Sequence, residues 1–147
     1  MLPLSGRRGT STLLALLSGV LLVFSFPKYG HPAFAWIALA PLFVACATTH
    51  DVWRGIRLGF LTGFVGFLGT LYWVVGVVQV FGGLPTPVAG IVGVLTAMYL
   101  SIFPAVFGGL MVRAVRRFGL VGVWLAPALW VATEWLGWGP LVQIGDL

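Results

Sequence analysis

The feature that most constrains this chain is a long stretch without any charged residue, which runs from Leu58 to Val112. It holds 55 residues, and as one helix rising about 1.5 Å per residue it would be roughly 80 Å long. The hydrocarbon core of a bilayer is only about 30 Å thick, so the stretch is too long for a single span. Near its middle, residues 81–87 include two glycines and two prolines, which break a helix. The stretch therefore predicts two membrane helices joined by a tight turn with an aromatic residue at its tip.

The composition leads to the same class of protein. Hydrophobic residues make up 60% of the chain and charged residues 7%, whereas soluble domains carry about 25% charged residues. A soluble fold of this length has no means of burying so much apolar surface, which indicates an integral membrane protein. The net charge of +5 comes from short arginine clusters between apolar runs, which membrane topology explains better than nucleic-acid binding. The single cysteine, Cys46, lies in an apolar run and is interpreted as a small buried hydrophobe, without disulfide or metal chemistry.

Five apolar runs predict an all-α, polytopic transmembrane helix bundle over residues 1–136, followed by a short outward-facing tail at 137–147. Both early runs are short, so a re-entrant pair is the alternative to two full spans. A cleaved signal peptide is a less favoured alternative, because Pro27, Lys28 and His31 lie between the apolar core and the small-residue triplet at 33–35. Pro41 and Pro104 should kink their helices. The expected helices cover 11–27, 33–49, 58–80, 88–112 and 118–136.

The basic residues predict an orientation. With five spans, one side of the membrane holds seven arginines, whereas the other holds only Lys28. Such an asymmetry is typical of the positive-inside rule, so we expect a cytoplasmic N-terminus in a bacterial cytoplasmic (inner) membrane. The arginines are Arg7, Arg8, Arg54, Arg57, Arg113, Arg116 and Arg117.

Small residues form two stripes on the helices of the central hairpin. The first follows Gly59, Gly63, Gly66 and Thr70, and small side chains at this spacing let a neighbouring helix approach closely. The second stripe lies on the following helix, and we expect the two to face each other. Its members are Gly90, Gly93 or Val94, Ala97, Ser101, Ala105 and Gly108.

Few residues suggest chemistry. Glu134 is the only acid within an apolar run. It is either an interfacial carboxylate in contact with water, or a group that orients a polar substrate head or pairs with a cation on another segment. Tyr72, Trp73 and Phe81 gather at the predicted outer boundary, as an interfacial belt or a lipid-contact platform. His31 and His50 fall on opposite sides of the membrane and are interpreted as loop residues. We expect no catalytic residue, metal site or cofactor within this chain.

Several segments, in this order, resemble the amino-terminal membrane region of bacterial apolipoprotein N-acyltransferases. They are FSFPKYG at 24–30, ALAPL at 38–42, GFLTGF at 59–64, YWV at 72–74, FGGLP at 81–85, AMYLS at 97–101 and PALWVATEWL at 127–136. None is specific alone, but their order and spacing extend over nearly the whole chain. The match departs from the family pattern after Leu136, where Gly137 replaces the usual arginine.

The resemblance implies an enzyme that transfers an acyl chain from a phospholipid to the amino-terminal diacylglyceryl-cysteine of a lipoprotein. It also implies that a periplasmic nitrilase-like domain supplies a Glu-Lys-Cys triad. None of that triad matches a position here, so we expect a truncated form, inactive alone, that contributes the membrane part. By position, the resemblance implies that Tyr72, Trp73, Phe81 and Glu134 lie beneath the catalytic domain and contact lipid. The alternative is a non-enzymatic membrane module, such as a transporter subunit or assembly factor. Against transport, the stretch 58–112 offers only a few hydroxyl and amide groups.

Overall fold

The computed structural model describes the backbone of residues 4–26 and 33–145, and the side chains of residues 9–26, 33–34 and 37–135. Within these ranges every regular element is a helix, which confirms the all-α bundle. The elements are α1 (Leu4–Phe24), α2 (Ala33–Ala38), α3 (Ala40–Ala47), α4 (Val52–Thr70), α5 (Tyr72–Gly82), α6 (Thr86–Leu100), α7 (Ile102–Phe118), the 3₁₀ helix η1 (Gly119–Leu125) and α8 (Ala126–Gly145).

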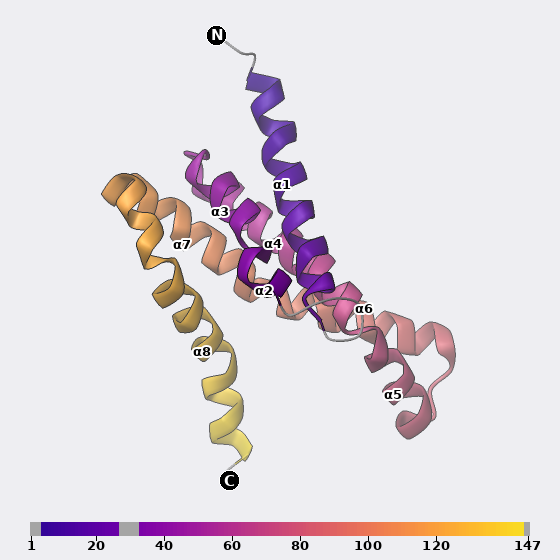
Figure 1. Cartoon of the computed structure of the whole chain (residues 1–147). Coiled ribbons are helices and arrows are strands. Elements are labelled where there is room, and N and C mark those ends of the chain that lie inside the picture. Colours follow the sequence, from indigo (N-terminus) through magenta and orange to yellow (C-terminus); the bar gives the residue numbers. More distant parts are fainter. Residues whose placement is uncertain (1–3, 27–32, 146–147) are drawn as a thin grey trace.

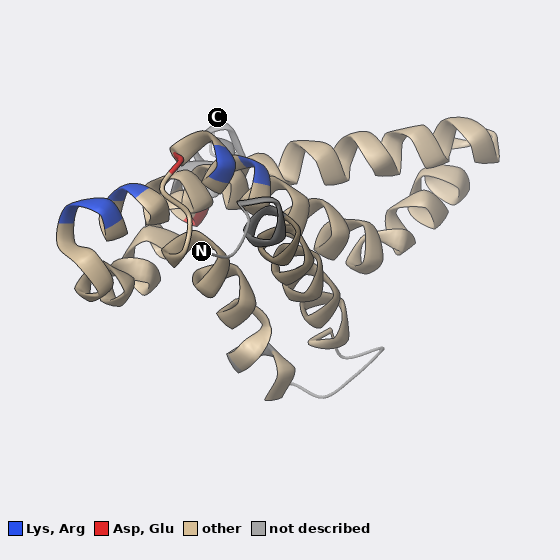
Figure 2. Cartoon of the chain, turned by 90° about the horizontal axis from the view of Figure 1, so that it is seen from above, with Lys and Arg blue, Asp and Glu red and all other residues tan. Residues whose placement is uncertain are grey.

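Helices α4 and α7 form the centre of the bundle, with α1 and α3 packed beside them (Figure 1). The α5–α6 hairpin extends sideways from this centre, and seen from above it projects well beyond the other helices (Figure 2). No residue of α5 is buried. The hydrophobic core is therefore confined to the other helices, and its buried members are Ala15, Leu42, Ala45, Cys46, Leu58, Phe107, Met111, Val112 and Ala126.

Glycines bring α4 and α7 into backbone contact. A Cβ added at Gly55 would lie 2.6 Å from the carbonyl oxygen of Gly108, and one at Gly59 would collide with the carbonyl oxygen of Pro104. Gly63 also faces this seam, where an added Cβ would lie 2.8 Å from Cγ of Pro104. The predicted contact between the two stripes is thus correct for the first part of α4, where it meets residues 101–108.

The same prediction is wrong for the remaining small residues. Gly66 faces Leu22 of α1, and a Cβ at Gly90 would have no atom within 4 Å. Gly93 faces Val75 of α5 instead of α4. The second stripe is divided between α6 and α7 by the break at Ser101, and at the level of Gly66 the neighbour of α4 is α1 instead of α7.

Hydroxyl groups join α1 to its neighbours inside the bundle. Thr62 Oγ1 donates to the carbonyl oxygen of Ala15 at 2.9 Å, and the Ser18 hydroxyl donates to the carbonyl oxygen of Ala38. Both side chains are fully buried. Because these groups are buried among apolar helices, each hydrogen bond satisfies a hydroxyl that would otherwise be costly to bury.

Both predicted proline kinks are present as helix breaks. The second apolar run is interrupted at Leu39, and Pro41 lies in the first turn of α3, where its missing N–H is tolerated. The fourth run is interrupted at Ser101, and Pro104 lies in the first turn of α7. At that break the Ser101 hydroxyl donates to the Ala97 carbonyl oxygen at 2.5 Å. The second run is short even when α2 and α3 are taken together, as expected.

A third break, at Leu71, divides the predicted helix 58–80 and was not predicted. The chain bends by 53° between α4 and α5. No proline or paired glycine marks this position, but Thr70 Oγ1 donates back to the carbonyl oxygen of Gly66 at 3.0 Å. Such back-bonding competes with the helical ladder and bends helices. The third apolar run is therefore two helices, and α4 begins at Val52, where Asp51 caps it by accepting from the Trp53 N–H at 3.1 Å.

The turn between α5 and α6 matches the prediction for residues 81–87. Gly83 has φ +62°, the left-handed conformation that favours glycine, and its N–H donates to the Gln79 carbonyl oxygen at 3.1 Å. Pro87 lies in the first turn of α6. The turn thus ends one helix and starts the next within a few residues.

The predicted bounds of the last helix need correction. Gly119 has φ +65° and ends α7, and residues 119–125 form η1 instead of the start of a helix at 118. The α-helix begins at Ala126, with Pro127 tolerated in its first turn, and it continues to Gly145. Most of the predicted tail 137–147 is thus helical in backbone. The described stretch 86–135 is long and apolar enough to cross a membrane, and α4 with α5 is a second such candidate if the bent pair is one span.

The described arginines lie at one end of the bundle, opposite the α5–α6 turn. Arg54 and Arg57 follow the start of α4, and the arginines of α7 occupy its last turns (Figure 2). The start of α4 packs against the middle of α7, where Gly55 faces Gly108 and Gly109 faces Ile56, and the arginines of α7 follow beyond this contact. The described arginines therefore gather at one end of the bundle in two groups, and the side of the membrane that this end faces stays a prediction. Lys28 and His31 lie outside the described residues, as do the side chains of Arg7 and Arg8.

Candidate functional site

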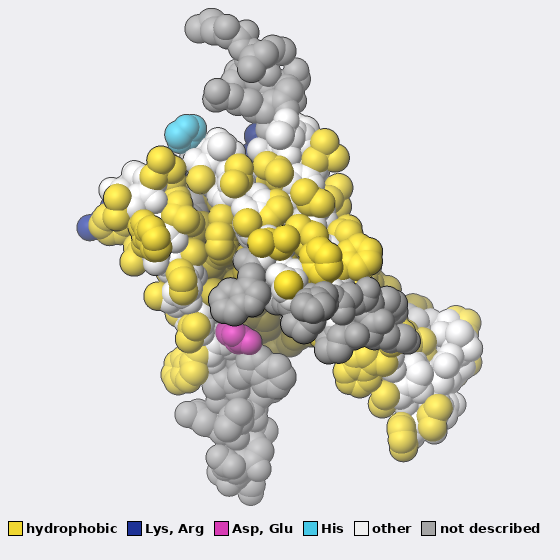
Figure 3. All heavy atoms as spheres, in the orientation of Figure 1, with side chains coloured by type: hydrophobic (Ala, Val, Ile, Leu, Met, Phe, Trp, Pro, Cys, Tyr) yellow, Lys and Arg dark blue, Asp and Glu magenta, His cyan; other side chains and the backbone are white. Residues whose placement is uncertain are grey.

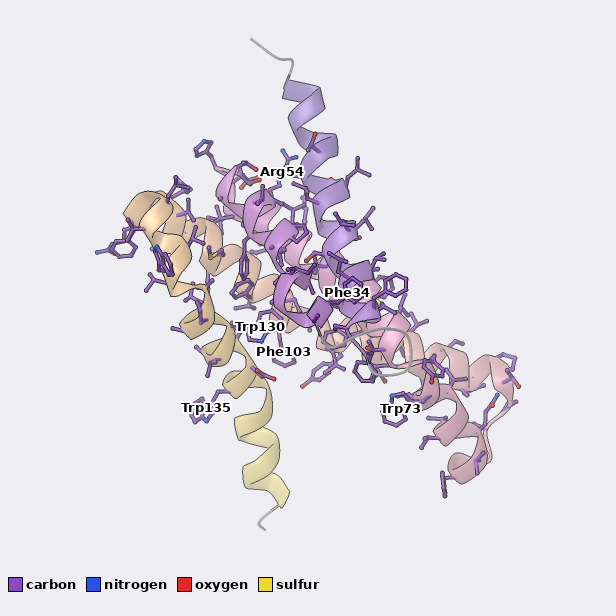
Figure 4. All side chains as sticks on the ribbon, viewed as in Figure 1. Phe34, Arg54, Trp73, Phe103, Trp130 and Trp135 are labelled. Atoms are coloured by element: carbon purple, nitrogen blue, oxygen red, sulfur yellow. The ribbon has the colours of Figure 1, made fainter. Side chains whose placement is uncertain are left out.

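Tyr72 and Trp73 lie at the start of α5, immediately after the bend at Leu71. Their side chains are 41% and 51% exposed. Trp73 points away from the core of the bundle (Figure 4). Both aromatic residues therefore present apolar surface outward at the point where the hairpin leaves the bundle.

Phe81 lies at the other end of the same helix. Its side chain is 84% exposed, and Gly83 closes the helix two residues later. Eight residues separate it from Trp73, which corresponds to about 12 Å along a helix. Phe81 therefore stands at the tip of the hairpin, apart from the two residues at its base.

Glu134 lies on α8 with an exposed side chain. Beside it, an open apolar face of the helix runs at i, i+4 and i+8 spacing from Pro127 through Val131 to Trp135. Ala128 and Ala132 complete this face. At 100° per residue, Glu134 falls at the edge of this face. The helix thus presents an apolar surface with one carboxylate at its margin.

The four predicted site residues do not form one cluster. Three lie on α5 and one on α8, and these two helices make no contact among the described residues. Figure 4 shows Trp73 and Trp135 on helices that diverge from opposite sides of the bundle. Any lipid contact made by α5 is therefore separate from one made by α8.

An aromatic series that the sequence did not reveal joins α8 to the core. The rings of Phe43 and Phe107 have centroids 5.8 Å apart, and those of Phe107 and Trp130 are 5.2 Å apart, edge to face. Phe107 is fully buried. These residues come from α3, α7 and α8, so no spacing within one helix predicts their contact. The series positions the first turns of α8, and with them the apolar face.

The described residues offer binding surface and no visible machinery for a covalent reaction. Cys46 is fully buried in the core, as interpreted from the sequence. No group of three or more metal-ligating side chains occurs in the part of the chain that the structure describes. Hydrophobic side chains cover most of the visible surface of the described helices (Figure 3). Extended apolar surface of this kind is typical of contact with lipid or with other membrane helices.

The fold and this surface define an all-α helical bundle of the membrane-protein class. The model of the apolipoprotein N-acyltransferase N-terminal domain matches residues 18–144. The chain therefore belongs to the apolipoprotein N-acyltransferase family, as the sequence segments indicated.

Curated relatives agree with this assignment. The chain is similar to apolipoprotein N-acyltransferases of Geobacter metallireducens, at 41% identity over 92% of this chain, and of Methylococcus capsulatus, at 37% over 90%. It is also similar to that of Vibrio cholerae, at 31% over 86%. The chain spans only 29%, 27% and 25% of the lengths of these three proteins. The match therefore covers between a quarter and a third of each of these proteins and not their full length.

Proposed function

We propose that this chain is the membrane part of an acyltransferase that acts in bacterial lipoprotein biosynthesis. The reaction moves an acyl chain from a phospholipid to the amino-terminal diacylglyceryl-cysteine of a lipoprotein. The family match over residues 18–144 carries this proposal. The apolar faces of α8 and of the α5–α6 hairpin support a role in holding lipid chains. The membrane is the cytoplasmic one, and the N-terminus faces the cytoplasm.

Within this proposal, the site residues act at two separate places. Tyr72, Trp73 and Phe81 contact lipid along the hairpin, and Glu134 orients a polar head group beside the apolar face of α8. Among the described residues Cys46 is fully buried, whereas a thiolate nucleophile needs access to substrate. In this proposal the nucleophile and its acid–base partners therefore belong to a catalytic domain and not to the membrane part.

The first test of the proposal is the activity of the 147-residue chain itself. Purified in detergent and mixed with phospholipid and a diacylated lipopeptide, it is expected to transfer no acyl chain, because the thiol of Cys46 is fully buried. Mass spectrometry of the lipopeptide measures the transfer. As a control, a full-length relative such as that of Geobacter metallireducens should acylate the same peptide. Acylation by this chain alone would contradict the proposal that the reactive groups belong to a separate catalytic domain. Solute flux in proteoliposomes would instead favour a transporter.

The orientation is tested by labelling single cysteines in intact cells. After Cys46→Ala, the exposed residues Thr86 and His50 are replaced by cysteine one at a time. A membrane-impermeant maleimide is expected to label position 86, at the hairpin turn, at least tenfold faster than position 50, at the arginine-rich end. Permeabilised cells should label both positions alike. Faster labelling of position 50 in intact cells would reverse the orientation.

A further inference from the structure

A cavity of about 510 Å³ lies between α1 and the start of α4, at the arginine-rich end of the bundle. Thr12 lines it from α1, and Asp51, Arg54, Arg57, Leu58 and Leu61 line it from α4 and its cap. We call this cavity the α1–α4 wedge. Its inner end closes where α1 and α4 touch, at the hydrogen bond from Thr62 to Ala15 and at Gly19, where an added Cβ would lie 2.8 Å from the carbonyl oxygen of Thr62. The volume falls within the usual range of small-molecule sites.

The charges that line the wedge favour an anion. Arg54 and Arg57 are three residues apart and so occupy one face of α4, with Arg54 half-buried and Arg57 exposed. Figure 4 shows Arg54 between α1 and α3. Asp51 is the one acid in the lining, and its carboxylate accepts from the Trp53 N–H as the helix cap. Two guanidinium groups on adjacent turns suit the oxygens of a phosphate, which they bind in pairs.

The depth of the wedge favours a lipid over a soluble anion. Trp53 is 69% exposed beside the arginines, and exposed tryptophans of membrane proteins concentrate at the level of the lipid head groups. One to two turns further along α4, Leu58 and Leu61 form the apolar floor of the same cavity. A ligand that fills the wedge therefore meets positive charge at the mouth and hydrocarbon below. An anionic phospholipid has this same order of groups.

We propose that the α1–α4 wedge binds the phosphate head group of an anionic phospholipid, with Arg54 and Arg57 at the phosphate and Leu58 and Leu61 against the first carbons of its chains. This site lies at the opposite end of the bundle from the hairpin turn and apart from Glu134. It does not depend on acyl transfer, and it would hold a lipid from the leaflet at the arginine-rich end as a structural ligand.

The experiment is native mass spectrometry of the 147-residue chain in a neutral detergent, titrated with phosphatidylglycerol or with phosphatidylcholine of the same chains. The chain is expected to bind one phosphatidylglycerol at least tenfold more tightly than phosphatidylcholine. The double variant Arg54→Gln with Arg57→Gln should weaken binding about 25-fold, since each basic residue near an anionic lipid contributes about fivefold. The matched control is Arg116→Gln with Arg117→Gln, which removes equal charge from the last turn of α7, whose arginines do not line the wedge, and should cost less than about threefold.

Two further arms make the assignment specific. Thr12→Trp fills the wedge from the exposed side of α1, leaves both arginines in place, and should weaken phosphatidylglycerol binding about tenfold or more. Glycerol phosphate, the soluble form of the same head group, should displace the lipid poorly because it lacks the chains. Equal losses in the two double variants, or unchanged binding in Thr12→Trp, would overturn the site. Displacement by glycerol phosphate at equal concentration would overturn the lipid assignment.

Discussion

Replacing Gly59 by leucine is expected to lower the thermal unfolding midpoint of the detergent-solubilised chain by about 5–10 °C. Even a Cβ at this position collides with the carbonyl oxygen of Pro104, which is backbone and has no rotamer by which to move away. Overpacking in a close-packed interior typically costs 1–3 kcal/mol, and for a chain of this length about 2–4 °C accompany each kcal/mol. The central contact of α4 with α7 would have to open. Circular dichroism, or a melting assay that uses no thiol-reactive dye, measures the midpoint.

The matched control for this variant is Gly90→Leu on α6. An added Cβ there meets no atom within 4 Å, and leucine has a higher helix propensity than glycine, so the midpoint should stay within about 2 °C of the parent. Gly63→Leu should fall between the two, because its nearest contact is the Pro104 ring. Equal midpoints for the variants at positions 59 and 90 would contradict the inference that the contact of α4 with α7 depends on the close approach of their backbones.

The helical class and the main breaks of this chain are readable from its sequence because they depend on local chemistry. Prolines 41 and 104 and the glycines of the 81–87 turn act on their own backbone, and the helices break where these residues predict. The bend at Leu71 has no such residue beside it: the Thr70 hydroxyl donates to the Gly66 carbonyl oxygen, but Thr96 makes the same kind of bond to Val92 within α6 without ending that helix. The sequence therefore predicts a single helix where the structure has α4 and α5.

Small-residue spacing predicted which side of α4 is packed but not the partner at each level. Gly59 and Gly63 meet α7, whereas Gly66 and Gly69 meet Leu22 and Val23 of α1. The partner is set by how three helices cross, and no single helix encodes that. The same limit applies to the candidate site. Tyr72, Trp73 and Phe81 share a helix with each other, but Glu134 lies on a helix that α5 does not touch among the described residues.

Replacing Phe107 by alanine is expected to be the most destabilising single change in the aromatic series, at about 3–5 kcal/mol. The side chain is fully buried and contacts the rings of Phe43 and Trp130, so its removal leaves a cavity shared by α3, α7 and α8. The loss should reach the apolar face of α8 as well. A cysteine introduced at Val131, on the apolar face of α8, should react with maleimide at rates that differ several-fold between Phe107→Ala and the parent chain. The reason is that the neighbouring Trp130 loses the ring against which it packs.

Phe81→Ala is the matched control for this variant, because it removes the same side chain where it is 84% exposed. Its midpoint should fall by no more than about 2 °C, since surface truncations away from packed contacts usually stay within 0.5 kcal/mol. Two readouts separate the roles of Phe107. A lower midpoint with unchanged labelling at position 131 would mean that Phe107 fills the core without positioning α8. An unchanged midpoint would contradict the buried series itself, and with it the attachment of α8 to the bundle through Trp130.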